Sequence, residues 1–335
     1  MIDEKILVSL KDIEQNTTQA LISHGAAPWV AAEVAKAVKQ AEAEGNLICG
    51  LFYLDSYCKQ LASGRVKGAV DPIVSQPKGS AVKVDAQLGF AQAAFAKGFD
   101  KAVELAKLNG TASLAICHSH TCTSMGYFTE QIAKAGLIGI GMTNAPACVS
   151  PPGASKAVLG TNPISMAVPS KEGGVAFKFD QSTSAIAIGK IRIAAAAGEK
   201  IPFGWAVDKN GEPTDDPVAG LEGSLVSAGG YKGYGFGLMA EILAAAVTGS
   251  NNSVDAPALK TTEGAPHDLG QFYFLLDPTL YSGDAFWERL ETLQQAVNSQ
   301  ENARLPGSQP KEVTEVLISK TLWDSVLNNL CPTST

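Results

Sequence analysis

The residues best suited to chemistry stand together in one short polar segment, residues 118–124, with the sequence His-Ser-His-Thr-Cys-Thr-Ser. Two of the four histidines of the chain, His118 and His120, belong to it. An imidazole exchanges protons near neutral pH, and hydroxyl groups donate hydrogen bonds to anions. The segment could therefore transfer protons or bind a phosphate or carboxylate. A simple crossover turn of an α/β protein would have much the same composition.

The neighbouring residues predict the elements that would position this segment. The apolar run 113–117 predicts a buried strand, residues 126–133 have a helical pattern, and the apolar run 137–142 predicts a second strand. The polar segment would then lie between a strand end and a helix start. A helix N-terminus carries unpaired N–H groups and a partial positive charge, which favour an anion. Residues 229–233, Gly-Gly-Tyr-Lys-Gly, precede another predicted helix and have the same potential, although their spacing is not that of a Walker A loop.

Composition narrows the class of protein. The 335 residues are 45% hydrophobic and 18% charged, which predicts a globular chain with a sizeable core. The net charge of −7, without a dense Lys/Arg block, argues against a nucleic-acid partner. No apolar run is long enough for a membrane helix, and the N-terminus lacks the pattern of a signal peptide. We therefore expect a cytoplasmic protein with no membrane partner.

The spacing of the cysteines and histidines predicts the state of the thiols and whether the chain has a metal-binding motif. The six cysteines form no CxxC pair, which favours free thiols in a reducing compartment. The four histidines show neither HxxxH nor HExxH spacing, so we predict no dedicated metal site.

The rest of the chain predicts alternating helices and strands. Residues 9–44 have the pattern of two helices, with Ser9 as the first N-cap and Gly25 and Gly45 at the helix ends. Residues 89–108 predict an alanine-rich helix. Strands are expected at 164–169, 175–179, 203–207 and 271–276, helices at 185–197, 234–247 and 285–296, and a last strand or helix within 312–330.

Several separate stretches, taken in order, are similar to one known family. They are residues 50–64, Ser119 with His120, residues 160–163 (Gly-Thr-Asn-Pro), Asp180 with Ser184, residues 204–208 (Gly-Trp-Ala-Val-Asp), residues 229–233, and residues 304–307 (Arg-Leu-Pro-Gly). With them the chain resembles the malate/L-lactate dehydrogenase family of NAD(P)H-dependent reductases, in particular its Δ1-piperideine-2-carboxylate/Δ1-pyrroline-2-carboxylate reductase branch. The stretches cover nearly the whole chain, and the absence of GxGxxG agrees with a family that lacks a Rossmann fold.

This resemblance implies an α/β protein with a central mixed sheet, flanking helices and a helical N-terminal portion. We expect that portion to be residues 1–70, packed with residues 311–335, and the cofactor- and substrate-binding core to be residues 71–310. The resemblance also implies a homodimer whose sites are completed across the interface. The implied reaction is hydride transfer to C2 of a 2-oxo acid or a cyclic 2-imino acid.

The resemblance also implies which residues bind the cofactor, with NADPH favoured and NADH possible. They are Thr121, Cys122, Thr123, Ser124 and Met125 at the phosphates, completed by Phe179, Asp180, Gln181, Lys232, Gly233, Arg304, Pro306, Gly307, Ser308 and Gln309.

The chain departs from the family pattern at the proton donor and the carboxylate clamp. Where the family commonly has Ser-His-Gly and then Arg, this chain has Ile-Cys-Gly at 48–50 and then Tyr53. Cys49 and His120 remain as candidate donors, and we favour His120 because Cys49 has apolar neighbours in sequence. Tyr53, Thr161 and Lys190 are the candidates for binding the substrate carboxylate.

These departures favour an imine substrate. A cyclic imine can arrive already protonated, whereas a carbonyl needs a proton donor for the developing alkoxide. We therefore predict an NAD(P)H-dependent reductase that makes L-proline or L-pipecolate from Δ1-pyrroline-2-carboxylate or Δ1-piperideine-2-carboxylate. The alternatives are a 2-hydroxy-acid dehydrogenase of the malate, lactate or ureidoglycolate type, and a non-catalytic homologue that still binds the cofactor.

Overall fold

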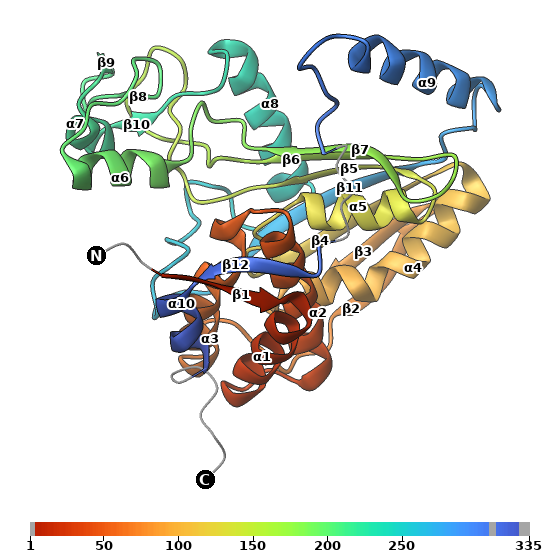
Figure 1. Cartoon of the computed structure of the whole chain (residues 1–335), viewed down its shortest axis with the longest axis horizontal. Helices are drawn as coiled ribbons and strands as arrows, with labels where there is room; N and C mark the ends of the chain where they lie inside the picture. The colour runs from red at the N-terminus through yellow and green to blue at the C-terminus, as the bar shows by residue number, and fades with distance from the viewer. Residues whose placement is uncertain (1–3, 308–312, 328–335) are drawn as a thin grey trace.

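A seven-stranded mixed sheet forms the centre of the molecule in the computed structural model, which describes residues 4–307 and 313–327 (Figure 1). In spatial order its strands are β2 (Ile73–Lys78), β3 (Ala81–Asp85), β4 (Thr111–Ser119), β11 (Leu269–Leu276), β5 (Ile138–Thr143), β6 (Ile164–Pro169) and β7 (Val175–Gln181). β3 and β4 run parallel, and the other neighbours are antiparallel. The predicted α/β fold with a central mixed sheet is confirmed.

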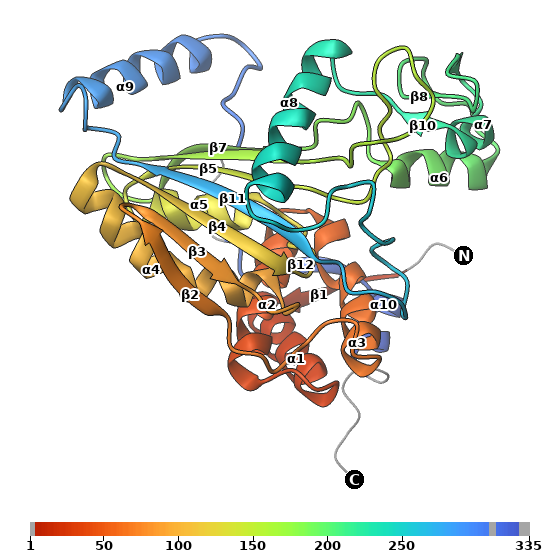
Figure 2. The same cartoon turned by 180° about the vertical axis from the view of Figure 1, so that it is seen from behind.

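Helices cover one face of this sheet closely. α4 (Ala91–Asn109) and α5 (Gly126–Lys134) lie between the sheet and the N-terminal helices (Figures 1 and 2). Leu114 and Ile116 of β4 are fully buried in the same cluster as Phe95 and Phe128 from these helices. Burial of such side chains stabilises the layer by about 1.5–3 kcal/mol each.

The opposite face is covered less completely. α8 (Tyr231–Glu241) continues into a π-helical segment (Ile242–Ala246) that contacts β11 and β5. α9 (Ala285–Asn298) stands apart from the body in both views and has no buried residue (Figure 2). The helix predicted at 234–247 thus begins three residues earlier, at Tyr231.

The N-terminal portion is helical, as expected, and includes part of the C-terminal segment. It contains β1 (Lys5–Ser9), α1 (Leu10–Ser23), α2 (Pro28–Ala43), the short 3-10 helices Leu47–Cys49 and Leu51–Tyr53, α3 (Leu54–Ala62), β12 (Glu315–Ser319) and α10 (Lys320–Ser325). β1 pairs with β12 in an antiparallel ladder, and Trp323 shares a buried cluster with Ile13 and Leu54. The division at residue 70 stays a prediction, and parts of 311–335 lie outside the described residues.

Local signals explain where the first helices begin and end. The hydroxyl of Ser9 accepts a hydrogen bond from the Asp12 N–H at 3.0 Å, which confirms the predicted N-cap. Gly25 and Gly45 follow the two helices with φ of 101° and 73°, a conformation that favours glycine.

A small lobe lies beyond the end of β7. It holds α6 (Ile188–Ala197), β8 (Ala206–Val207), β9 (Pro213–Thr214), α7 (Pro217–Glu222) and β10 (Ser224–Leu225). The strand expected at 203–207 is therefore only its last two residues. Among the described residues, no helix combines the length and apolar character needed to cross a bilayer.

Candidate active site

Three of the segments predicted to bind the cofactor meet at the start of α5. The Ser124 hydroxyl donates to Oδ2 of Asp180 at 3.0 Å, and the Gly126 N–H donates to the same oxygen at 2.8 Å. The Lys178 N–H donates to the carbonyl of Pro306 at 3.1 Å, so the segment that carries Pro306 lies along β7. The fold thus brings residues 121–125, 179–181 and 304–307 together. Ser308 and Gln309 lie outside the described residues.

The carboxylate of Asp180 occupies the N-terminus of α5. Burial raises the pKa of this carboxyl, while the Gly126 N–H and Ser124 hydroxyl favour the charged form. The anion that this helix start attracts is therefore a side chain of the protein itself. A cofactor phosphate would need donors elsewhere in the loop or in the neighbouring segments.

A second group of predicted residues is linked to the end of β7 through main-chain hydrogen bonds. The Ala228 N–H donates to the carbonyl of Thr183, and the Thr183 N–H donates to the carbonyl of Thr161, both at 2.9 Å. Gly233 is required beside this link, since a Cβ there would lie 1.9 Å from the Ala228 carbonyl oxygen. Lys232 is exposed in the first turn of α8.

Donors near Lys232 suit a phosphate group. Gly229 and Gly230 turn the chain with φ of 67° and 66°, and the Gly230 N–H donates to the Ser227 carbonyl at 3.1 Å. The N–H groups of the first turn of α8 then lie beside the exposed cation Lys232. The residues present therefore fit the phosphate end of a nicotinamide cofactor. Lys190, by contrast, is exposed on α6 and forms no hydrogen bond with Thr161 or Tyr53 in the described structure.

His120 is buried, with 1% of its surface exposed. Its Nε2 lies 2.7 Å from Oε1 of Gln60, whose amide group donates to the carbonyls of Leu259 and Thr261. Because the amide of Gln60 is fixed by two acceptors, Oε1 faces His120 as an acceptor and the imidazole Nε2 carries the proton. Nδ1 of His120 has no hydrogen-bond partner in the described structure.

His267 is stacked on His120, with ring centroids 3.9 Å apart. Its Nε2 donates to the Leu259 carbonyl at 3.0 Å, and its Nδ1 accepts from the Thr121 N–H at 3.2 Å. Burial and the nearby Arg65 lower the pKa of His267 to about 3. Burial and His267 also hold the pKa of His120 well below its ordinary value. Both rings are neutral at neutral pH.

Cys49 and Tyr53 lie in the two 3-10 helices that precede α3. Burial and the nearby Asp180 raise the pKa of the Cys49 thiol to about 12. Burial also raises the pKa of Tyr53, and its buried hydroxyl has no hydrogen-bond partner in the described structure. Cys122, in the predicted cofactor loop, is within electrostatic range of both side chains. The substrate-side residues and the cofactor loop are therefore neighbours.

Lys260 is a cation at this site that the sequence did not single out. Its ammonium lies 3.9 Å from the centroid of the Phe52 ring and 5.1 Å from that of Tyr53. Burial and the nearby Arg192 lower the pKa of the Lys260 ammonium, and the nearby Cys49 acts in the opposite direction. No ion pair involves Lys260 among the residues that the structure describes. The residue stands in a polar loop without a motif, so its place beside Tyr53 is visible only in three dimensions.

Arg65 holds the loop that carries Lys260 and His267. Its guanidinium donates to the carbonyls of Ala258, Thr261 and Ala265. Gln60 and Arg65, both buried, thus fix the segment 258–267 against α3. Neither role could be predicted from sequence, because the partners are almost two hundred residues away along the chain.

Comparison with known proteins identifies the relatives of this chain. Residues 8–316 match the family model described as malate/L-lactate dehydrogenase. A (2R)-3-sulfolactate dehydrogenase (NADP(+)) from Chromohalobacter salexigens is 38% identical over 302 residues, 90% of each chain. A Δ1-pyrroline-2-carboxylate/Δ1-piperideine-2-carboxylate reductase from Pseudomonas syringae pv. tomato is 37% identical, over 85% of this chain and 83% of its own.

A solved structure has the same fold. The crystal structure of Δ1-piperideine-2-carboxylate reductase from Pseudomonas syringae pv. tomato superposes with a TM-score of 0.84 and 35% identity. The match covers 90% of this chain and 91% of that one.

Proposed function

The chain belongs to the malate/L-lactate dehydrogenase family, and we propose that it is an NADPH-dependent reductase of small cyclic 2-imino acids. The products would be L-proline from Δ1-pyrroline-2-carboxylate or L-pipecolate from Δ1-piperideine-2-carboxylate. The named relatives that act on these imines, including the one of solved structure, support this substrate class.

One observation carries the choice of an imine over a carbonyl. Cys49, Tyr53, His120 and His267 all have pKa values displaced away from neutrality. The pKa of Cys49 is raised to about 12, that of Tyr53 is raised, and those of His120 and His267 are lowered. A general acid works best with a pKa near the working pH. A substrate whose nitrogen is already protonated does not need one.

The chemistry of the proposed reaction balances without a protein acid. Bound NADPH would supply a hydride to C2 of the substrate. The electron pair of the C=N bond then moves to the ring nitrogen, which already carries its proton. The residues of the chain would orient the ring, bind its carboxylate and exclude water.

For the carboxylate we propose Lys260, with Tyr53 beside it. Lys260 lies over the face of the Tyr53 ring, and the Tyr53 hydroxyl lacks a partner in the described structure. A bound carboxylate would accept from both groups. Thr161 and Lys190, the other predicted contacts, stay proposals, although the exposure of Lys190 on α6 makes it the weaker one.

For the cofactor we propose the residues that converge around the end of β7. Thr121, Cys122, Thr123, Ser124 and Met125 form the loop before α5, Phe179, Asp180 and Gln181 end β7, and Arg304, Pro306 and Gly307 lie beside it. Lys232 and Gly233 would bind a phosphate. NADPH is favoured over NADH, since one named relative uses NADP(+).

Assembly as a homodimer is part of this proposal. α9 has no buried residue, and Phe236, Met239 and Ile242 of the neighbouring helix are 58%, 38% and 54% exposed. Phe274 of the central strand β11 is also exposed, at 41%. Exposed apolar side chains of this size on α8, the π-helical segment and β11 favour a protein partner. The five described cysteines are all free, which supports the expected reducing, cytoplasmic compartment.

A second candidate is a 2-hydroxy-acid dehydrogenase. The 38% identity to the sulfolactate dehydrogenase favours it. It would require a proton donor for an alkoxide, which the pKa values of Cys49 and His120 do not provide.

A substrate panel separates these functions. The purified protein would be assayed with NADPH and with NADH against both cyclic imino acids, oxaloacetate, pyruvate and sulfopyruvate, by nicotinamide absorbance. We expect turnover with the imino acids. Turnover of oxo acids alone would support the second candidate, and cofactor binding without any turnover would identify a non-catalytic homologue.

Variants of the two candidate donors test the protonation step. If the imine brings its proton, Cys49→Ala and His120→Ala should each lose less than about tenfold in turnover, whereas general acid catalysis is worth roughly 10²–10⁴-fold. Rates of all three proteins should fall together as pH rises and the iminium is lost. A loss above a hundredfold in one variant alone would identify that residue as the acid.

A further inference from the structure

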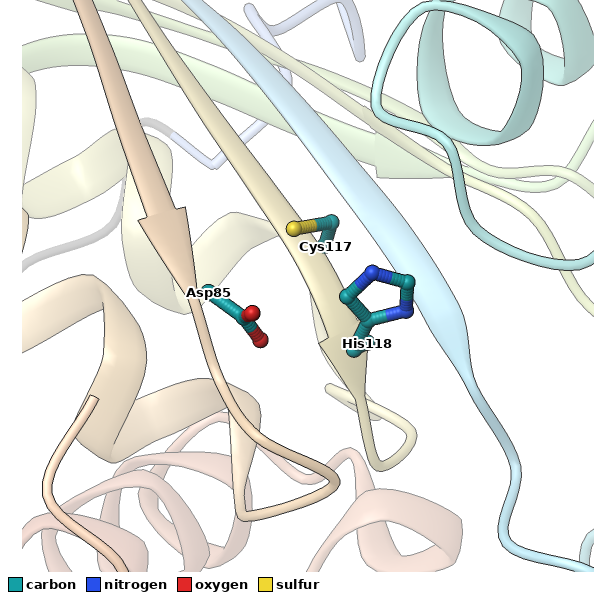
Figure 3. Close-up of side chains that lie close together, drawn as sticks. All are labelled: Asp85, Cys117 and His118. Carbon is teal, nitrogen blue, oxygen red and sulfur yellow. The ribbon is translucent and has the colours of Figure 1, made fainter. Parts of the chain in front are cut away.

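A group of potential metal ligands lies at the carboxyl ends of β3 and β4, separate from the residues proposed to bind cofactor and substrate. Asp85 ends β3, and Cys117 and His118 are near the end of β4. The parallel register places Asp85 directly opposite Cys117. One ligand atom from each of the three side chains lies within 4.8 Å of the others. Figure 3 shows the three side chains close together.

These residue types match a zinc-type cation. Such ions bind thiolate sulfur, imidazole nitrogen and carboxylate oxygen, and sites with three protein ligands keep a fourth position for water. The sequence did not reveal this group, because Asp85 stands far from the Cys117–His118 pair along the chain and only the parallel pairing of β3 with β4 unites them.

The histidine is oriented as a metal ligand would be. Its Nδ1 lies 2.8 Å from Oδ1 of Asp268, which leaves Nε2 without a hydrogen bond in the described structure. In Figure 3 the ring lies on the β11 side of Cys117, and Asp85 lies on the β3 side. A carboxylate on the second ring nitrogen is the usual support of a metal-bound histidine, because it fixes the tautomer and orientation.

Two carboxylates and one lysine surround this group: Asp85 and Asp268 act on Cys117 against Lys83, so negative charge prevails. Asp85 and Asp268 contribute two carboxylates, and neither forms an ion pair with a lysine or arginine among the described residues. Oδ1 of Asp85 accepts from the Gln87 N–H at 2.8 Å. The other oxygen of Asp85 forms no hydrogen bond with the residues that the structure describes. His118 and Asp268 are 38% and 26% exposed, so an ion could reach them from solvent.

Backbone strain is concentrated at the same place. Gln87, Leu88, His118 and Asp268 have φ of 53°, 64°, 53° and 49°, four of the seven non-glycine residues with positive φ among those described. The Leu88 N–H donates to the His118 carbonyl at 2.7 Å, so the strained segments are in direct contact. Residues are held in this region at a cost, and such positions gather at functional sites.

We propose that Asp85, Cys117 and His118 bind a divalent cation of the zinc class, with Asp268 supporting the histidine. Bound metal would join β3 to β4 and, through Asp268, to the start of β11. His118 and Asp268 directly adjoin segments that carry His120 and His267. The ion would therefore hold together the two segments that form the histidine stack, without taking part in hydride transfer.

The test uses the reduced, full-length protein and Co²⁺ as a probe. One equivalent should produce a sulfur-to-cobalt charge-transfer band in the near ultraviolet, and an equivalent of Zn²⁺ should abolish it. Cys117→Ser should remove the band, whereas Cys148→Ser, a change at a cysteine outside the group, should keep it.

Three further variants examine the other groups with little change of backbone. Asparagine tolerates positive φ, so His118→Asn and Asp268→Asn keep the local conformation. His118→Asn and Asp85→Asn should weaken Zn²⁺ binding in calorimetry, and Asp268→Asn should weaken it about 10–100-fold. Circular dichroism confirms that each variant is folded. Absence of the cobalt band in the parent protein, or a band that persists in Cys117→Ser, would overturn the proposal.

Discussion

The imidazole of His120 lies against that of His267, with ring planes inclined by 21°. Each ring is held in one tautomer by a different group: the side chain of Gln60 for His120, and the Leu259 carbonyl for His267. The pair is therefore a neutral structural link between the loop after β4 and the segment before β11. Several expected outcomes depend on it and on its neighbours.

Acid should destabilise the protein through this pair. In the folded state the pKa of His267 is lowered to about 3, whereas the ordinary value is 6.5, so the unfolded state binds more protons between these limits. The stability that the folded state gains from holding His267 neutral is fully present above pH 6.5 and is lost as the pH falls toward 3. The free energy of unfolding should fall by on the order of 1.4 kcal/mol per pH unit for each buried histidine.

Urea unfolding across this pH range measures that slope. His267→Gln should give a shallower dependence on pH than the parent protein, whatever its absolute stability. His24→Gln, at the half-buried C-cap of α1, is the control. Equal slopes in the parent and His267→Gln would show that this ring does not carry the effect.

Removal of the Gln60 amide should loosen the segment 258–267. Gln60→Leu leaves Nε2 of His120 without its buried acceptor, at a cost of about 1–3 kcal/mol, and removes one of the two donors to each of the Leu259 and Thr261 carbonyls. Thermal unfolding should show a clear drop, whereas Lys59→Ala, one residue earlier and exposed, should change little. A stability for Gln60→Leu close to that of the control would contradict the role of this amide.

The cap of α5 should depend on the charge of Asp180. Asp180→Asn keeps an acceptor for the Gly126 N–H but removes the negative charge at the helix start, at a cost of about 0.5–2 kcal/mol. Asp284→Asn is the comparison, because Asp284 begins α9 without a side-chain cap bond. Chemical denaturation of both variants measures the difference, and equal effects would argue against the cap.

Binding of the substrate carboxylate should depend on Lys260. Lys260→Ala should raise KM for the imino acid roughly tenfold, near the lower end expected of a charge-assisted hydrogen bond because the lysine is partly exposed. The turnover number should change little, and Lys260→Arg should restore most of the affinity. Lys190→Ala serves as the competing variant: if it alone raises KM, the carboxylate binds on α6 instead.

Cofactor affinity should depend on Lys232. Lys232→Ala should weaken NADPH binding by about 1.5–3 kcal/mol, as expected for the loss of a cation beside a phosphate. Fluorescence titration measures it, with Lys209→Ala on a distant turn as the control. Unchanged affinity in Lys232→Ala would place the phosphate elsewhere.

Local sequence patterns predicted the helices and strands well. They did not predict which residues far apart in the sequence form contacts with one another. Ser9 and Gly25 mark helix ends because capping and left-handed turns depend on neighbouring residues. The role of Asp180 at α5 could not be predicted, because its hydrogen-bond partners stand more than fifty residues earlier in the chain. The same holds for Lys260 beside Tyr53. The resemblance to a known family indicated the fold and the cofactor segments, but it could not indicate which residues replace a missing histidine and arginine.

The pairing of β1 with β12 has a consequence for how the protein is made. β1 is the first described element and β12 is near the end, and the buried cluster around Ile13 and Leu54 includes Trp323 from the segment after β12. The chain is synthesised from its N-terminal side, so α1 to α3 must keep part of their apolar surface exposed until β12 and α10 have been released from the ribosome. Closure of the N-terminal portion therefore follows synthesis of β12, and translation that stops before β12 should yield a product bound by chaperones.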